Sequence, residues 1–133
     1  MKIVADTSTF HFYNANPKNR RTGDCVVRAI ATATGKTWEE VLTGLTEMAL
    51  KHKQMVNSPE LYDKYLQAHG WVKHKQPRKP DNKKYTGAEW VKIFKGTAVA
   101  NIGGNHTVCI KDGKVWDIWN STGGCIGNYW TKP

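Results

Sequence analysis

The sequence predicts an α+β fold in which helices come first and antiparallel strands follow. Capping boxes that start helices occur at Thr37 and Thr86. After Gly96 the hydrophobic period changes from helical to extended, and Asp112-Gly113 then forms a strong hairpin signal. The 133 residues suffice for one ordinary domain. We therefore expect a single domain, residues 1–133, with a helical part over about 22–95 and a sheet part over about 97–130.

Each expected helix has a recognisable start or stop. Asp24 is a candidate N-cap for the first helix, and Gly35 ends it. Pro59 occupies the favoured first position of the third helix. The four helices are expected over residues 25–34, from 37, from 58 to before 70, and 86–95.

The expected strands cover residues 10–13, 97–102, 106–110, 114–119 and 125–130. A two-residue Asp112-Gly113 loop places Lys111 opposite Lys114. In that register Asp117 faces Val108 and lies diagonal to His106, at about 7–8 Å between backbones. A three-residue loop would instead turn Asp117 to the other face of the sheet.

Composition excludes several classes of protein. No apolar run approaches the roughly 18 residues that span a bilayer, and the start lacks the apolar segment of a signal peptide. We therefore expect a cytoplasmic protein without membrane contact. The three cysteines form no CxxC pair and show no zinc-ligand spacing, so neither a disulfide framework nor a metal site is expected.

The net charge of +9 is concentrated in the second half of the chain. Residues 73–84 contain six Lys or Arg and one Asp. Such a segment is either a solvated loop or a docking surface for an acidic protein or nucleic acid. The candidate docking residues are Lys75, Arg78, Lys79 and Lys83.

Three residues together suggest nucleophilic catalysis. Cys25 begins an apolar helix, where unpaired N–H groups and the helix dipole favour a thiolate. His106 follows two glycines at a strand start, and Asp117 lies between large apolar residues, where a carboxylate needs a partner. Cys25 and His106 each have a structural alternative when taken alone, as a core cysteine and as a histidine at a strand end.

As a set, they match a thiol nucleophile with its base and orienting acid. Cys25 would attack a carbonyl, His106 would transfer the protons, and Asp117 would orient the imidazole. The backbone N–H of Cys25 and the amide of Asn19 are candidate donors to the oxyanion. Trp119 lies opposite His106 in the expected register and is positioned to shield its hydrogen bond.

The segments around these residues carry a family resemblance. Residues 23–30 (GDCVVRAI), 103–108 (GGNHTV) and 112–121 (DGKVWDIWNS) resemble the nucleophile helix and the histidine and acid strands of small papain-like cysteine peptidases of phages and bacteria. Bacteriocin-leader peptidases and transglutaminase-like proteins share the order Cys, His, acid. The resemblance covers about residues 19–121 and implies a helical half packed on an antiparallel sheet. Asn19 stands where the family usually has glutamine. Asn120 is a second candidate to orient His106, since papain uses an asparagine in that role, but its parity places it on the face away from Asp117, so Asp117 is preferred.

The resemblance implies a thiol hydrolase that cleaves an amide, peptide or isopeptide bond through a thioester, with no cofactor. Its partner would be a protein or peptide substrate. Acyl transfer and deamidation use the same residues. The alternative from another class is a basic binding module on an inactive papain-like fold, which would bind nucleic acid or inhibit a host protein.

Overall fold

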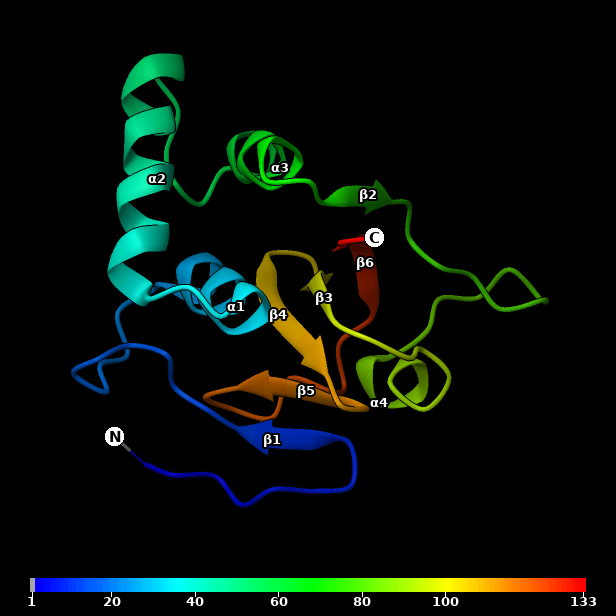
Figure 1. Cartoon of the computed structure of the whole chain (residues 1–133). Helices are drawn as coiled ribbons and strands as arrows, with labels where there is room; N and C mark the ends of the chain where they lie inside the picture. The colour runs from blue at the N-terminus through cyan, green and yellow to red at the C-terminus, as the bar shows by residue number, and fades with distance from the viewer. Residues whose placement is uncertain (1) are drawn as a thin grey trace.

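The computed structural model describes residues 2–133, which fold into four helices and a six-stranded mixed sheet (Figure 1). The helices are α1 (Cys25–Thr34), α2 (Trp38–His52), α3 (Pro59–Ala68) and α4 (Gly87–Trp90). The strands are β1 (Phe10–Phe12), β2 (Val72–His74), β3 (Ala98–Ile102), β4 (His106–Lys111), β5 (Lys114–Asp117) and β6 (Ile126–Thr131). The predicted α+β class is confirmed.

The sheet has the order β1-β5-β4-β3-β6-β2, and two of its strands differ from the prediction. β1 pairs with β5 in parallel, with Phe10 opposite Val115, so a wholly antiparallel sheet was wrong. β1 can pair with β5 in parallel because the long connection between the two strands contains helices. β2 pairs with β6, so the sheet also recruits residues outside 97–130.

Both predicted capping boxes are present, one at the start of α2 and one at the start of α4. α4 is shorter than predicted and ends at Trp90. The N–H groups of Lys92 and Ile93 bond to carbonyls three residues back rather than four. Such bonds tighten the chain into a turn, which ends the regular helix early.

Two apolar clusters cover the two faces of the sheet. In β3, Val99 packs with the cluster of α1, α2 and α3, whereas Ala98 and Ala100 pack with the cluster that contains Trp90 of α4. Neighbouring residues of a strand point to opposite faces, so the helices divide between the two sides of the sheet. No helix within residues 2–133 combines the length and hydrophobicity needed to cross a bilayer.

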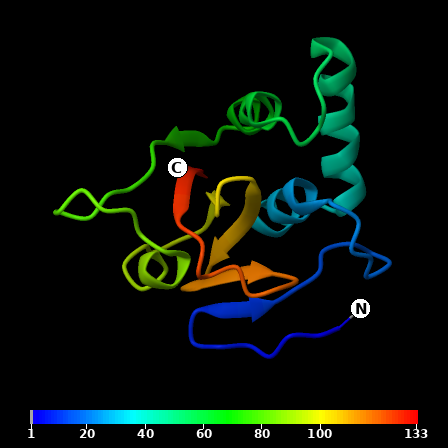
Figure 2. The same ribbon diagram turned by 180° about the vertical axis from the view of Figure 1, so that it is seen from behind.

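The ribbon extends at two opposite ends. The loop between β1 and α1 projects at one end, and the segment between β2 and α4 projects at the other, in both views (Figures 1 and 2). We call residues 75–86 the basic arm. One isolated antiparallel β-bridge pairs Arg78 with Lys84 within the arm. A second pairs Thr86, at the end of the arm, with Cys125.

Candidate active site

Cys25 is the first residue of α1 and is half-buried. The first hydrogen bond between helix turns runs from the Arg28 N–H to the Asp24 carbonyl, at 2.9 Å. The N–H of Cys25 therefore lies outside the internal hydrogen bonds of the helix. The thiol is thus placed at the positive end of the α1 dipole, where a thiolate is favoured.

His106 lies between the thiol and a carboxylate. Its Nε2 is 2.6 Å from Oδ2 of Asp117, and the Cys25 thiol is the second group that interacts with its ring and shifts its pKa. Because Asp117 engages Nε2, Nδ1 is the ring nitrogen left for the sulfur. The structure thereby brings all three sequence-predicted residues together, with His106 between the thiol and the carboxylate.

Asp117 is held from several sides and is only 2% exposed. Its carboxylate accepts hydrogen bonds from the Ser121 hydroxyl at 2.8 Å, the Ile118 N–H at 2.8 Å and the Arg28 guanidinium at 3.2 Å. Its backbone carbonyl accepts from the Tyr13 N–H at 2.9 Å, just beyond β1. This many donors fix the carboxylate in its ionised form.

The pKa values of the thiol and the imidazole move in opposite directions. Burial alone would raise the pKa of Cys25, but hydrogen bonds from His106 and the Thr107 N–H lower it overall. Burial alone would lower the pKa of His106, but hydrogen bonds with Asp117 and Cys25 raise it to about 9. Between these two pKa values the stable form is a thiolate–imidazolium pair.

The predicted hairpin register is confirmed, with one difference at its open end. Cys109 faces Trp116, and Lys111 faces Lys114 across the two-residue turn. The paired ladder ends at Cys109 and Trp116, one pair before the expected Val108–Asp117 pair. His106 and Asp117 therefore meet beyond the last ladder pair, where β4 and β5 separate.

Arg28 is a part of this site that the sequence prediction missed. Arg28 is 7% exposed and forms ion pairs with both Asp117 and Asp24. Its Nε donates a hydrogen bond to Oδ1 of Asp24 at 2.8 Å. Arg28 lies three residues after Cys25, on the same side of α1. A charged residue within the apolar run 25–34 was the available signal, because a buried arginine requires acidic partners.

Asp24 precedes the helix as predicted, but it does not cap it with its side chain. Its carboxylate instead accepts from Arg28, from the Trp38 indole at 2.9 Å and from the Asn16 amide at 3.1 Å. A charge-assisted bond to a buried guanidinium is stronger than a bond to a backbone N–H, so Arg28 takes the carboxylate. The N-terminal N–H groups of α1 stay available as a result.

The remaining sequence-predicted site residues have different positions. The Trp119 ring lies 5.1 Å from the His106 ring, between centroids, and is itself partly exposed. Asn120 accepts from the Thr122 hydroxyl at 2.5 Å and its N–H at 3.1 Å, so its amide shapes the following turn. Asn19 is exposed, with a left-handed φ of 53°, and lines a hollow beside Trp119.

The predicted docking residues lie on the basic arm, at the opposite end of the molecule from the β1–α1 loop (Figure 1). Lys79 is paired with Glu89 at 2.5 Å, so its charge is compensated. Arg78 donates to the Asn82 carbonyl within the arm. The contacts of Lys79 and Arg78 thus stabilise the arm. Among the described residues, the side chains of Lys75 and Lys83 form no such ion pair or hydrogen bond.

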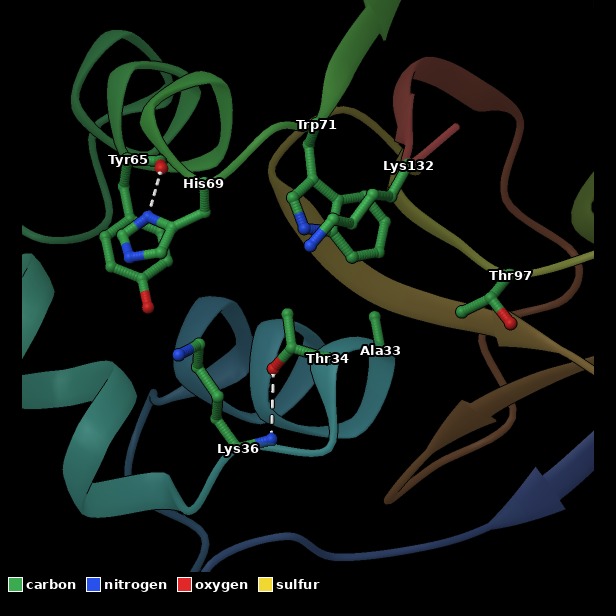
Figure 3. A pocket seen from close by; sticks show the side chains of 8 residues that line it. All are labelled: Ala33, Thr34, Lys36, Tyr65, His69, Trp71, Thr97 and Lys132. Atoms are coloured by element: carbon green, nitrogen blue, oxygen red, sulfur yellow. Dashed lines mark hydrogen bonds between the residues drawn. The ribbon is translucent and has the colours of Figure 1, made fainter.

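A separate hollow lies at the other end of α1 (Figure 3). It measures about 440 Å³, and its walls include Thr34, Tyr65, Trp71 and Lys132. Thr34 is the last residue of α1, whereas Cys25 is the first. This hollow therefore contains none of the three residues of the Cys–His–Asp chain.

Comparisons of the chain with models of protein families, with curated proteins and with solved structures found no significant match.

Proposed function

We propose that this protein is a papain-like thiol hydrolase that cleaves an amide, peptide or isopeptide bond through a thioester. One observation carries the proposal. A buried carboxylate, Asp117, binds the His106 imidazole at 2.6 Å, and the same imidazole lowers the pKa of the thiol at the start of α1. A nucleophile, a base in contact with it and a group that orients the base are what acyl transfer requires.

The reaction follows from these contacts. The Cys25 thiolate attacks the substrate carbonyl, and the charge moves to the oxygen, toward the N–H of Cys25. The imidazolium of His106 gives its proton to the departing nitrogen as the C–N bond breaks, which leaves a thioester. Neutral His106 then takes a proton from water, the resulting hydroxide attacks the thioester, the acid product leaves, and the Cys25 thiolate and the His106 imidazolium are restored. A different acyl acceptor in the last step would make the same site an acyl transferase.

The pKa directions set the pH range of activity. The thiolate is lost as the pH falls through the lowered pKa of Cys25, and the imidazolium is lost as the pH rises through about 9. We expect kcat/KM for hydrolysis to be maximal at neutral to mildly alkaline pH and to decline above about 9. A small activated ester, p-nitrophenyl acetate, provides the readout before a natural substrate is known.

The first test is the pH dependence of Cys25 alkylation by iodoacetamide, followed by peptide mass spectrometry. We expect Cys25 to react below pH 7, and His106→Ala to abolish this advantage because the thiolate loses its counter-ion. Cys109 and Cys125 are internal controls. Burial raises the pKa of Cys109 to about 12, so it stays unreactive. A Cys25 that titrates near pH 8.5, like a free thiol, with no effect of His106→Ala would overturn the proposal.

A further inference from the structure

A hollow of about 500 Å³, lined by cationic and apolar residues, lies between the segment that precedes Cys25 and the segment that follows Asp117. Arg20 and Arg21 contribute from the first segment, and Ile118 and Trp119 from the second. Lys2 adds a third cation from the N-terminal segment. The hollow thus brings together chain segments that are distant in sequence and that border the two ends of the Cys–His–Asp chain.

The charge of this hollow is uncompensated. Its lining has three cationic side chains and no acidic one. Within residues 2–133, the ion pairs of lysine and arginine involve Arg28, Lys64 and Lys79, and none involves Lys2, Arg20 or Arg21. Clustered cations in a concave surface focus a positive potential and attract anions.

Trp119 connects the hollow to the reacting groups. Its ring lines the hollow and packs against His106 at 5.1 Å between centroids. On the other side, Thr22 also lines the hollow and lies three residues before Cys25. A substrate whose carbonyl lies at Cys25 can therefore place a neighbouring group among the arginines.

We propose that this hollow binds a carboxylate of the substrate, adjacent to the bond that Cys25 attacks. The inference rests on the proposed function and narrows its substrates to acidic peptides. Guanidinium groups bind carboxylates through two parallel hydrogen bonds, and Trp119 and Ile118 provide an apolar surface for the carbon chain beside the charge. The carboxylate belongs either to an acidic side chain or to the end of a peptide chain.

The test compares two aromatic disulfide reagents, the dianionic 5,5′-dithiobis(2-nitrobenzoate) and the neutral 4,4′-dithiodipyridine. For each reagent, the rate constant for Cys25 is measured in a Cys125→Ser protein. It is then divided by the rate constant of the same reagent with 2-mercaptoethanol. We expect Cys25 to react preferentially with the dianionic reagent. At low salt, this preference should fall on the order of tenfold in the Arg20→Gln/Arg21→Gln protein. The preference should also weaken in 0.5 M NaCl, where the Debye length is only about 4 Å. Lys51→Gln/Lys92→Gln removes the same charge elsewhere and should leave it unchanged.

The rate with the neutral reagent separates the two proposals. Slow reaction of Cys25 with both reagents would overturn the proposed function. Fast reaction with the neutral reagent, together with an unchanged dianion preference in Arg20→Gln/Arg21→Gln, would overturn only the carboxylate site. Protection of Cys25 by N-acetyl-Gly-Glu-amide indicates a side-chain carboxylate, and protection by N-acetyl-Gly-Gly with a free terminus indicates a chain end. Protection by neither, at concentrations where both dissolve freely, counts against the carboxylate site.

Discussion

Replacing Arg28 with methionine is expected to lower the free energy of unfolding by about 3–5 kcal/mol. Arg28 is 7% exposed and is the cation between the carboxylates of Asp24 and Asp117. Methionine fills a similar volume, so the main effect is two buried anions without their shared counter-charge. Removal of one partner from a buried ion pair costs more than the pair itself contributes. The midpoint of urea unfolding at pH 7 measures the effect.

Two further variants test the cause of this loss. Arg28→Lys keeps the charge but cannot donate to both carboxylates in the same geometry, so an intermediate loss is expected. Lys64→Met breaks the exposed pair with Glu60 and should cost about 0.5 kcal/mol or less. An Arg28→Met protein as stable as Lys64→Met would show that water, rather than Arg28, compensates the two carboxylates.

Replacing Asp117 with asparagine is expected to slow hydrolysis by about 10²- to 10⁴-fold, the range that general acid–base catalysis contributes. Asparagine still offers an oxygen to His106, but it carries no charge. The imidazole then loses the main interaction that raises its pKa to about 9, and neutral His106 forms at pH 7. The thiolate of Cys25 loses its counter-ion at the same time. An NMR titration of the His106 ring nitrogens measures the pKa directly.

Ser121→Ala is the matched control, because it removes one hydrogen bond to Asp117 and leaves the carboxylate charged. A smaller shift in the His106 pKa is expected. In the Asp117→Asn protein, a His106 pKa that stays near 9 would contradict the assigned role of the carboxylate. The raised pKa also contributes to stability, fully below pH 6.5, and this contribution is lost as the pH rises through about 9.

The parts of the fold that sequence reasoning predicted depend on local chemistry. The capping boxes of α2 and α4 and the two-residue turn between β4 and β5 are determined by neighbouring residues. Turn length alone fixes the register of the hairpin, and the register brings Asp117 to the same side as His106. The positions of the acid and base relative to each other could therefore be derived without a structure.

The parts that sequence reasoning missed depend on contacts between distant segments. β1 is only three residues long and pairs with β5, and nothing within Phe10–Phe12 specifies its partner. β2 is equally short and belongs to a segment whose lysines suggest a loop. The role of Arg28 depends on both Asp24 and Asp117, and no local pattern identifies the second. Local signals thus predict elements and turns, while buried charge networks emerge only from tertiary packing.

The pairing of β1 with β5 also has a consequence for synthesis. A ribosome makes Cys25 long before His106 and Asp117, and domains fold as units once their chain has emerged. Until β5 has emerged, His106 lacks the Asp117 carboxylate that raises its pKa, and the Cys25 thiol is expected to behave as an ordinary protonated thiol. A nascent or prematurely terminated chain is therefore expected to lack the lowered thiol pKa of the folded protein. The lowered pKa of the thiol is thus expected only once β5 has joined the sheet.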